Sequence, residues 1–360
     1  MCHNLPRGFA RFFLLLLVFS AVNCISPYLA NADSGARTNR LRICTQNLNN
    51  FQVEGRKRPH SSVEKHVQFL LQRMKEASCD VIAVQEVGGA TKRIAHSNLE
   101  ILSQALSRDT DRKFNSYVGK SDDGWISNGF IVADDVGKFL DLKSLTGANL
   151  PKLQPLGRSH RFIRGPVKLA MLVGSKRAKN WKKLVFFNMH LKSKSNSWKD
   201  PTKTSFETLR MEMAEALRIA AEREEEKGEG DRQVVIVLGD RNSDGDSASA
   251  DILAGRLFLA DFSTPSKCML DSQLRSSCSN VSRRSPFLVS LFGEEGFSPS
   301  MLQKRGSYMY KGKPYWLDDI LVAKDDFRYF QRPDGSMAIG LEGQFNVGSD
   351  HKLLWAEMGW

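Results

Sequence analysis

The chain has 360 residues, of which 52 are Lys or Arg and 40 are Asp or Glu, so its formal net charge at pH 7 is +12. A charged fraction of 26% and a mean hydropathy of −0.35 exclude a multi-span membrane protein and a disordered polyelectrolyte. The sequence therefore predicts a globular protein. The basic balance favours anionic partners, such as nucleic acid or acidic lipid head groups.

The first 32 residues have the pattern of a secretory signal peptide. Two arginines precede an apolar run over Phe12–Phe19, and Ala30-Asn31-Ala32 has the small-x-small form that signal peptidase cuts. The apolar run is short for a membrane anchor, so a retained anchor is less favoured than a cleaved signal peptide. A lipoprotein site at Cys24 is also less favoured, because the residue before it is Asn. We expect cleavage after Ala32, secretion or export to the periplasm, and no stable membrane insertion afterwards. The mature chain stays basic, with 50 basic and 40 acidic residues.

Export implies an oxidising compartment, where the four cysteines of the mature chain allow three full pairings. Cys268 and Cys278 are ten residues apart in a Ser-rich stretch, which favours a local disulfide. Cys44 and Cys79 lie in or beside apolar strand patterns, where we interpret them as two small buried side chains. The pairing as a whole stays open.

The mature chain begins with a predicted strand, helix and strand. Leu41–Leu48 alternates as a short strand. Ser61 and Ser62 offer N-caps for an amphipathic helix that ends near Ala77. A buried type of strand follows over Asp80–Gln85. This order implies a parallel pair of strands early in the chain.

The rest of the chain is rich in strands. The predicted strands are Gly129–Val132, Val167–Val173, Leu184–Met189, Val234–Leu238, Trp316–Val322 and Leu353–Glu357. We expect only one other long helix, over Ser205–Glu226, with Leu209, Met213 and Leu217 on one face and charges on the other. Lys227–Gln233 is interpreted as a loop, so residues 33–360 are expected to form a single α/β domain, monomeric, with a mixed sheet or two packed sheets and helices outside.

Polar side chains recur where the predicted strands end. They are Asn47, Glu86, His190, Asp240, Asn242, Asp318, Asp350 and His351. Singly, each is ordinary, because turns favour Asn and Asp. Ligand sites of α/β sheets gather beyond the carboxyl ends of strands, so these residues are expected to share one cleft. Such a set could hold a hard cation and perform phosphoryl chemistry.

Six segments resemble, in order, motifs of the endonuclease/exonuclease/phosphatase superfamily. They are "TQNLNNF", "VIAVQEV", "NMHLKS", "VLGDRNS", "WLDDILV" and "GSDH", and they span nearly the whole mature chain. The stretch "GSYMYKGKPYWLDDIL" is also similar to a segment of secreted bacterial nucleases. The resemblance implies the DNase-I-like four-layer sandwich, with two mixed β-sheets packed face to face and helices outside.

The resemblance also implies a metal site. Glu86 would be the principal ligand, and Asn47 and Asp350 would complete the metal and water shell. Mg²⁺ is the expected cofactor, with Mn²⁺ or Ca²⁺ as substitutes. Some members carry Asp two residues after the first Asn, where this chain has Asn49, so its metal shell is expected to be less anionic. Whether one metal or two operate stays open.

The remaining residues take catalytic roles by the same resemblance. Asp240, oriented by Asn242, would position or deprotonate the attacking water. Asp318 would hold His351, and His190 would reach the phosphate from the other side. These roles make physical sense, because a carboxylate beside a histidine raises its basicity and phosphodiester hydrolysis needs neutralisation of developing charge.

A neighbouring carboxylate competes with Asp318 for the place beside His351. Asp319 is that rival, and Asp318 is preferred because it occupies the superfamily's Asp position in "LDDI".

Basic residues surround His190 in the sequence. They are Lys176, Arg177, Lys179, Lys182, Lys183, Lys192, Lys194, Lys199 and Lys203. A second group comprises Arg158, Arg161, Arg164 and Lys168, and "FIRGPVKLAM" resembles the phosphate-contacting strand of DNase-I-like enzymes. Arg164, Lys192 and Lys194 are therefore the predicted substrate contacts. A basic run is ordinarily a solvated face, but a polyanion gives each cation a further phosphate to neutralise.

Three functions remain open. The leading one is a secreted, Mg²⁺-dependent endonuclease that hydrolyses DNA, and RNA as a further substrate, with low sequence specificity. The second is a sphingomyelinase, phospholipid or inositol-phosphate phosphoesterase, for which Ser285–Gly293 would be the membrane-contacting hairpin. The third is a catalytically silent nucleic-acid-binding module. The candidates for base stacking or minor-groove contacts are Trp125, Trp181, Trp198, Tyr308, Tyr310, Tyr315 and Trp316, although core packing is the expected use of most of them.

Overall fold

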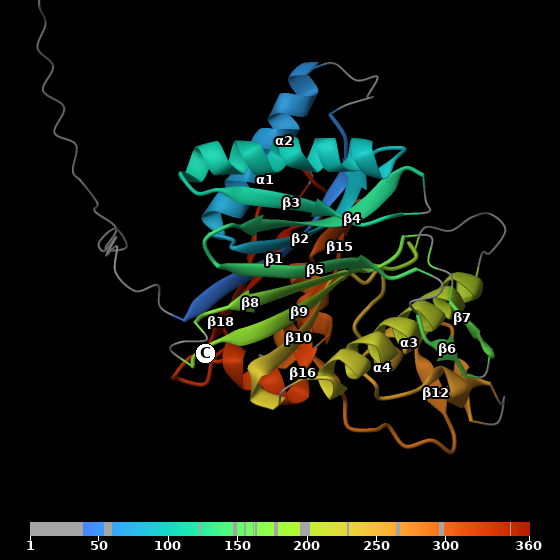
Figure 1. Ribbon diagram of the computed structural model, residues 1–360. Coiled ribbons are helices and arrows are strands. Elements are labelled where there is room, and N and C mark those ends of the chain that lie inside the picture. Colours follow the sequence, from blue (N-terminus) through green and yellow to red (C-terminus); the bar gives the residue numbers. More distant parts are fainter. Residues whose placement is uncertain are drawn as a thin grey trace, which may run out of the picture. The chain divides into compact units, whose positions relative to one another are not determined.

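Two mixed β-sheets form the centre of the protein in the computed structural model (Figure 1). The structure describes residues 39–53, 60–121, 124–146, 150–154, 156–160, 162, 164–175, 179–194, 202–228, 230–263, 267–294, 299–345 and 347–360. The predicted signal peptide lies outside the described residues. Asn39–Trp360 form one compact unit. Within the described part, no helix has the length and apolar character needed to cross a membrane.

The first sheet has six strands in the order β17-β18-β1-β2-β4-β3. Their bounds are β1 Arg40–Phe51, β2 Val81–Gly88, β3 Phe114–Val118, β4 Ile126–Ala133, β17 Ile339–Glu342 and β18 Leu353–Gly359. The β1–β2 pair is parallel, as the sequence predicted, and the other neighbours are antiparallel.

The second sheet also has six strands, in the order β13-β16-β10-β9-β8-β5. Their bounds are β5 Gly137–Ser144, β8 Val167–Val173, β9 Lys182–His190, β10 Gln233–Asp240, β13 Leu288–Ser290 and β16 Asp318–Ala323. Here β9 and β10 form the parallel pair. Short hairpins pair β6 Lys152–Leu153 with β7 Arg158–Ser159, β11 Cys268–Leu270 with β12 Ser276–Cys278, and β14 Tyr308–Tyr310 with β15 Lys313–Tyr315.

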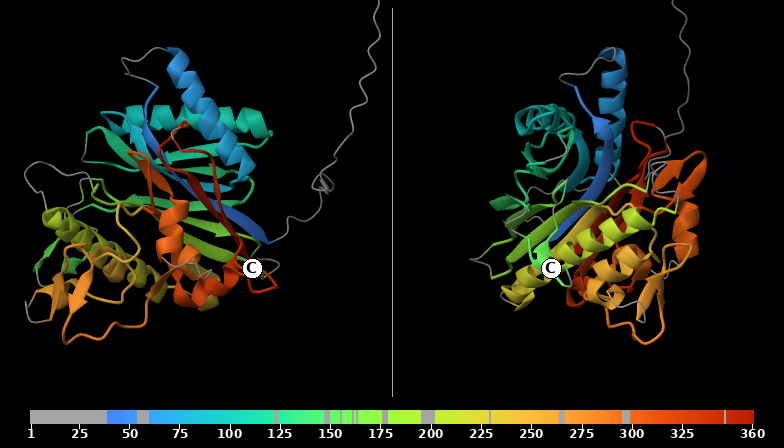
Figure 2. Two further views of the ribbon diagram at one scale, coloured as in Figure 1. Left: turned by 180° about the vertical axis from the view of Figure 1, so that it is seen from behind. Right: turned by 90° about the vertical axis from the view of Figure 1, so that its right-hand side faces the viewer.

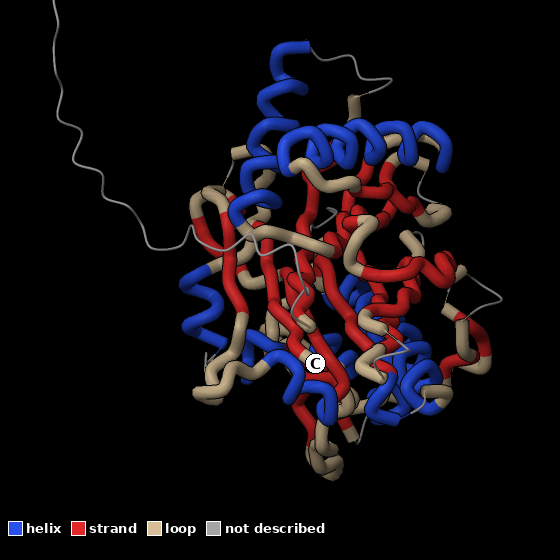
Figure 3. Tube along the Cα trace, turned by 60° about the vertical axis from the view of Figure 1, so that its left-hand side comes forward, coloured by secondary structure: helices blue, strands red, loops and turns tan. Residues whose placement is uncertain are grey.

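Helices cover the outer faces of both sheets. The α-helices are α1 His60–Glu76, α2 Lys92–Thr110, α3 Thr204–Glu226, α4 Ala248–Leu253, α5 Leu291–Glu294 and α6 Pro299–Arg305, and the 3₁₀ helices are η2 Gly230–Arg232, η3 Leu259–Phe262 and η4 Lys324–Phe330. Figures 1 and 2 show α1 and α2 on the first sheet and α3 on the second, at the opposite side of the sheets. Figure 3 shows the strands enclosed between these helices.

Alternation along the strands builds three apolar layers. Ile43 and Phe186 point into the core between the two sheets. Their neighbours point outward, because successive side chains of a strand leave opposite faces. Cys44 thus packs under α1 and α2, and Val185 packs under α3. The layers are therefore helix, sheet, sheet and helix, which confirms the predicted four-layer sandwich.

Two expectations about the helices were wrong. The second long helix, α2, escaped the sequence analysis, although Thr91 caps it and its buried residues recur at helical spacing, as in Ala95, Leu99, Leu102 and Leu106. The first helix begins at His60, so Ser61 and Ser62 lie inside it and cannot be its N-caps.

The charges of α3 also depart from expectation. Leu209 is exposed, whereas Glu207 and Arg210 are buried as an ion pair with 2.7 Å between Arg210 Nη2 and Glu207 Oε2. Arg210 Nη1 donates to the carbonyl oxygens of Lys192 and Ser193, at 2.9 and 3.3 Å. α3 covers the segment that follows β9, so the carbonyl oxygens of that segment need a buried hydrogen-bond donor. The amphipathic pattern of α3 alone does not show this, because the covered segment lies elsewhere in the chain.

The cysteines form two disulfides, Cys44–Cys79 and Cys268–Cys278. The second is the predicted local one, and it closes the β11–β12 hairpin. The first corrects the interpretation of Cys44 and Cys79 as unlinked small side chains: both are buried, and they join β1 to the residue that precedes the parallel strand β2 by two positions.

Candidate active site

Strand direction brings the predicted site residues to one edge of the sandwich. Asp240 pairs with His190 of the parallel neighbour β9 and with Asp318 of the antiparallel neighbour β16. Asp318 therefore begins a strand and does not end one, and His351 likewise precedes β18, which is antiparallel to β1. Asp350, next to His351, also precedes β18, so the expectation that all these residues end strands was wrong for three of them, yet the reversed strands carry them to the same place.

This edge holds a cleft of about 1130 Å³. Its predicted lining residues are Glu86, Arg164, His190, Lys194, Asp240, Asn242, Asp350 and His351. Asn47 and Asp318 lie directly behind that lining, hydrogen-bonded to Asp240 and His351, respectively. The shared cleft that the motif order predicted is thus present in the fold.

Glu86 is aimed into the cleft by a bulge. The register of β2 against β4 shifts between Val84 and Val87, and Glu86 has φ +59°. A non-glycine residue with positive φ is uncommon and costs on the order of 1–3 kcal/mol when it is strained. The carboxylate accepts from Asn47 Nδ2 at 3.1 Å and from the backbone N–H of Asn50 at 2.9 Å. The bulge re-aims this side chain out of the regular alternation.

Asn47 orients the carboxylates around it. Its Nδ2 donates to Glu86 Oε1 and to Asp240 Oδ2, both at 3.1 Å, while its Oδ1 accepts from the backbone of Asn49 at 2.9 Å. In this arrangement the amide oxygen is turned away from Glu86. Asn47 therefore holds the anionic groups in position, and its expected place as a metal ligand would require the amide to turn over.

Asp240 is buried and fully hydrogen-bonded. Only 1% of the residue is exposed; its Oδ1 accepts from the backbone N–H of Asn242 at 2.8 Å. Asn242 thus orients Asp240 as predicted, but through its backbone, since its side chain donates to the carbonyl oxygen of Leu191. Burial, only partly opposed by His351, raises the pKa of Asp240 to about 7, and the charges of Asp318 and Glu86 add to the increase.

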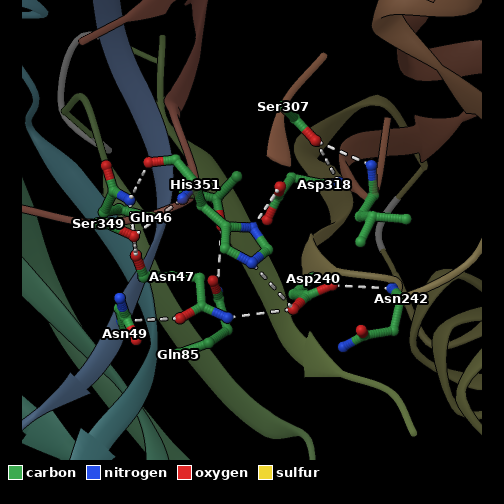
Figure 4. Close-up of polar contacts among 12 residues, drawn as sticks. Gln46, Asn47, Asn49, Gln85, Asp240, Asn242, Ser307, Asp318, Ser349 and His351 are labelled. Carbon is green, nitrogen blue, oxygen red and sulfur yellow. Dashed lines mark hydrogen bonds and ion pairs between the residues drawn. The ribbon is translucent and has the colours of Figure 1, made fainter. Parts of the chain in front are cut away.

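His351 lies between two carboxylates (Figure 4). Its Nδ1 is 2.8 Å from Asp318 Oδ2, and its Nε2 is 3.9 Å from Asp240 Oδ2. Burial disfavours the imidazolium, but the charge of Asp318 and its hydrogen bond, with Asp240 and Asp350, raise the pKa of His351 to about 10. The ring is therefore charged at neutral pH.

The structure separates Asp318 from its rival. Asp319 points to the other face of the strands, where its Oδ2 accepts from Arg241 Nη1 at 2.6 Å and its Oδ1 accepts from Ser290 Oγ at 2.6 Å. Since neighbouring residues of a strand face opposite ways, one of the two had to leave the cleft. The carboxylate beside His351 is thus that of Asp318, and its catalytic role stays a prediction.

His190 is held in the neutral state. Its Nε2 is 2.9 Å from Arg164 Nη1, and a guanidinium can only donate, so Nε2 must accept. Burial and then the charge of Arg164 hold the pKa of His190 well below its usual value. The same Nε2 lies 3.7 Å from Glu86 Oε1 and 3.6 Å from Asp240 Oδ2. Of the two histidines of the cleft, His351 is thus positively charged and His190 is neutral.

A buried support beneath the cleft was not predicted. Gln85 Nε2 donates to Asn188 Oδ1 at 2.7 Å across the two sheets, and Asn188 Nδ2 donates to the carbonyl oxygens of Val84 and Gly129. Arg73, also buried, donates to the carbonyl oxygen of His351 at 2.7 Å. The sequence did contain a signal for Asn188: it is a polar residue inside the apolar strand pattern "FFNMH", which indicates a buried, hydrogen-bonded side chain.

Only some of the basic residues that the sequence groups around His190 and that the structure describes lie at the cleft. Arg164, Lys194 and Lys203 line it. Lys182 lies at the far end of β9, where it donates to Tyr329. Lys168 forms an ion pair with Glu224 at 3.3 Å. Arg161, Lys176, Arg177 and Lys199 lie outside the described residues. Sequence proximity to His190 overstated the local charge because a strand carries its two ends apart.

The two predicted lysine contacts have other neighbours. Lys194 Nζ is 2.5 Å from Asp244 Oδ2, so part of its charge is already neutralised within the cleft. Lys192 is outside the lining of the cleft, and its Nζ lies 4.3 Å from the ring centroid of Phe206. Among the three predicted substrate contacts, Arg164 has the most direct relation to the catalytic groups.

The proposed membrane hairpin is not a surface feature. Leu288, Val289, Leu291 and Phe292 of Ser285–Gly293 are each at most 4% exposed and pack in the core beside β16. The segment is an ordinary edge strand and helix. It therefore does not offer the exposed apolar hairpin for which it was the best candidate under the lipid hypothesis.

The donor set of the cleft suits a hard divalent cation. Glu86, Asp240, Asp318 and Asp350 bring four carboxylates together against one charged imidazole. Burial is the main cause of the raised pKa of Asp240, and the charges of Asp318 and Glu86 add to it; a cation would offset the part that comes from these two charges. Asp240, Asp318 and His351 can place one ligand atom each within 4.8 Å of one another. Because Asp318 and His351 are already paired, Glu86 and Asp350, at the open side of the cleft, are the better ligands.

Solved structures share this fold. ANGEL2, described as a 2′,3′-cyclic phosphatase, matches with a TM-score of 0.54 at 13% sequence identity, over 88% of this chain and 94% of its own. Truncated Caenorhabditis elegans TDP2 matches with a TM-score of 0.51 at 13% identity, over 89% and 98%. Humanized D. rerio TDP2 matches with a TM-score of 0.50 at 14% identity, over 90% and 100%. No family model and no curated protein matches the sequence. At 13–14% identity the matches to solved structures show a shared fold, which agrees with the predicted four-layer sandwich.

Proposed function

We propose that the protein is a secreted, Mg²⁺-dependent nuclease that hydrolyses DNA, and RNA by the same chemistry, with low sequence specificity. The observation that carries the proposal is the meeting, in one cleft of a DNase-I-like fold, of a carboxylate cluster, a charged histidine and a neutral histidine beside an arginine. These are the groups that in-line attack on a phosphodiester requires.

Glu86 and Asp350 would hold the cation, and the hydrogen bonds from Asn47 would keep the carboxylates of Glu86 and Asp240 in position. When bound, Mg²⁺ would supply positive charge to the phosphate oxygens of the transition state. The strained backbone at Glu86 is consistent with this role, because such strain persists at sites where function requires it.

Asp240 would accept the proton of the attacking water. Both of its oxygens are fixed by hydrogen bonds, and its pKa of about 7 suits a general base at neutral pH. As the water oxygen bonds to phosphorus, its proton passes to Asp240; the bond from phosphorus to the leaving oxygen breaks, that oxygen keeps the electron pair, and the Nε2 proton of the charged His351 can neutralise it.

His351 and Arg164 would neutralise charge on the phosphate. The imidazolium of His351 is fixed by Asp318 and carries a proton on Nε2, on the side of Asp240. Arg164 can turn one donor to a phosphate oxygen while His190 accepts another. His190, with its low pKa, would serve as a neutral hydrogen-bonding partner in this pair.

A lipid substrate has less support. The apolar hairpin that it would need is buried, and the cleft is lined by Arg164, Lys194 and Lys203. A polynucleotide offers further phosphates to such cations. The basic net charge of the chain acts in the same direction.

Plasmid cleavage tests the proposal. Residues 33–360 with oxidised cysteines are incubated with supercoiled plasmid and Mg²⁺, with and without EDTA, and the His190→Ala and His351→Ala variants are run alongside. His96→Ala is the matched control, because His96 is an exposed histidine of α2 outside the cleft lining. We expect nicking by the wild type and by His96→Ala, and none with EDTA or in either cleft variant.

Two results would contradict the proposal. Plasmid and single-stranded DNA and RNA that all stay intact with Mg²⁺, Mn²⁺ and Ca²⁺ would exclude a nuclease. Full activity of the His351→Ala variant would show that the reaction occurs at another site.

A further inference from the structure

One wall of the cleft carries a row of tyrosines. The β14–β15 hairpin places Tyr308 opposite Tyr315, and Tyr310, two residues along β14, is on the same side as Tyr308. The ring centroids of Tyr308 and Tyr310 are 6.5 Å apart with their planes 16° from parallel. Those of Tyr308 and Tyr315 are also 6.5 Å apart. All three rings line the cleft.

The row leads from the catalytic centre to solvent. The ring of Tyr308 lies 4.6 Å from the ring of His351. Tyr310, at the outer end, is 50% exposed, whereas the tyrosine nearest to the catalytic groups is only partly exposed. A half-exposed aromatic ring in a cleft lined by charged groups leaves apolar surface in water, which a flat ligand would cover.

The neighbours of the row suit a polynucleotide chain. Lys194 Nζ is 5.6 Å from the ring centroid of Tyr315, and Lys311 Nζ is 5.3 Å from that of Tyr310. A phosphate bound beside His351 would carry its neighbouring base along this wall, with cations near the flanking backbone. Aromatic faces combined with basic side chains are the usual means of holding single strands.

The rings favour unpaired bases over paired ones. A base in a duplex already stacks on both neighbours, so it would have to leave the stack at a cost of a few kcal/mol. The catalytic carboxylate of Asp240 is also nearly inaccessible, with 1% of the residue exposed, at the base of the cleft. A single strand can bring both its phosphate and its base into such a cleft.

On these grounds we propose that Tyr310, backed by Tyr308 and Tyr315, is a stacking subsite for an unpaired nucleobase next to the scissile phosphate, so that the preferred substrate is single-stranded nucleic acid. This inference rests on the proposed nuclease function. It assigns substrate recognition to side chains that take no part in bond breaking.

The test compares kcat/KM for a single-stranded oligonucleotide and for its duplex. Variants are Tyr310→Ala, Tyr310→Phe and, as a control, Phe139→Ala, which removes an exposed aromatic side chain on β5 outside the cleft lining. Stacking is worth about 1–3 kcal/mol per base, so Tyr310→Ala should lower kcat/KM on the single strand by roughly 5-fold to 150-fold, mainly through KM. Tyr310→Phe keeps the ring and should stay close to wild type, as should Phe139→Ala.

A second substrate separates stacking from a general structural effect. Oligonucleotides with an abasic linker at each position flanking the cleavage site remove the base and leave the phosphate. At one position the wild type should lose as much activity as Tyr310→Ala loses on the intact strand, and the variant should lose nothing more, because both changes delete the same contact.

The outcomes distinguish the two proposals. If the wild type cleaves no nucleic acid, the proposed function fails. If it cleaves, three results overturn the inference alone: Tyr310→Ala retains wild-type activity on the single strand, the effects of the abasic linker and of Tyr310→Ala multiply at every position, or kcat/KM for the duplex equals or exceeds that for the single strand.

Discussion

At the scale of single residues, the chemistry of the cleft depends on what lies beside each histidine. The carboxylate of Asp318 accepts a hydrogen bond from Nδ1 of His351, and its negative charge keeps the ring protonated. Arg164 can only donate, so it keeps His190 neutral. Two identical side chains therefore take different roles because their nearest partners differ in charge.

Replacement of Asp318 tests the first pairing. Asp318→Asn removes the charge that holds the pKa of His351 at about 10, and we expect kcat to fall by roughly 10²–10⁴-fold at neutral pH, the usual worth of a positioned acid or base. Steady-state nuclease assays and far-UV circular dichroism measure activity and folding together. Asp141→Asn, at an exposed position of β5, is the control, and equal activity of the two variants would contradict the assigned pair.

Replacement of Arg164 tests the second pairing. Its charge is the largest influence, after burial, that lowers the pKa of His190. Arg164→Ala should therefore move the pKa of His190 upward, and KM for nucleic acid should rise as a phosphate contact is lost. Histidine titration followed by NMR gives the direction of the shift. An unchanged or lower pKa would show that Arg164 does not set the charge state.

At the scale of elements, the bulge in β2 lowers the stability of the fold but places the carboxylate of Glu86 in the cleft. Glu86 has a left-handed backbone that glycine adopts freely. The Glu86→Gly variant should therefore be more stable, with a free energy of unfolding about 1 kcal/mol above that of the wild type, but it should lose its activity. Urea unfolding and Mg²⁺ titration by calorimetry measure the two effects. Lower stability of the variant together with normal Mg²⁺ affinity would contradict both the strain and the ligand role.

The 3₁₀ helix η4 carries a carboxyl group whose pH response has a definite sign. Burial, reinforced by Glu225, raises the pKa of Asp326 to about 7, far above that of the unfolded chain. The folded protein therefore holds a proton that the unfolded chain has lost, so Asp326 lowers stability progressively as pH rises from about 4 to 7.

Asp326→Asn should thus stabilise the protein at pH 8 and have little effect near pH 4. The amide oxygen can still accept from the backbone of Val235, as Asp326 does at 3.3 Å. Thermal unfolding from pH 4 to 8 checks this. A difference in Tm between the two proteins that stays constant with pH would rule out Asp326 as the titrating group.

At the scale of the whole molecule, the two disulfides serve different parts. Cys44–Cys79 closes 35 residues around α1 in the first sheet, and Cys268–Cys278 closes ten residues of a hairpin. Residues 270–274 of that hairpin line the cleft. Loop-closure entropy assigns about 4 kcal/mol to the first bridge and about 3 kcal/mol to the second.

Paired substitutions separate these contributions. Cys44→Ala with Cys79→Ala should cost the larger free energy of unfolding, because both side chains are also buried, and should leave kcat/KM of the folded fraction unchanged. Cys268→Ala with Cys278→Ala should cost less and should raise KM, since the wall of the cleft is loosened. Chemical unfolding and kinetics measured on both double variants decide the matter, and the reverse order of KM effects would contradict it.

Much of the site could be predicted from local pattern. Glu86, His190 and Asp240 each sit in a short motif whose polar residue interrupts an apolar strand, His351 lies just before one, and the order of the motifs indicated the fold. The central strands of both sheets were predicted because their apolar runs are strong, whereas β3, β5, β13 and β17 were not predicted. The helix α2 was not predicted, although its apolar residues recur at helical spacing. The burial of the Glu207–Arg210 ion pair could not be predicted from the sequence, because it depends on the loop that α3 covers.

The amino-acid sequence by itself determined which chemical groups this protein has and in what order, together with the alternation that makes its strands and the apolar faces of its helices, because these depend on neighbours a few residues apart. Only the tertiary structure decided which of Asp318 and Asp319 faces the cleft, which histidine is charged, which lysines lie near it, and that a row of tyrosines lines its wall. Those properties depend on strand direction, burial and contacts between segments far apart in the chain, and these exist only once the two sheets have packed.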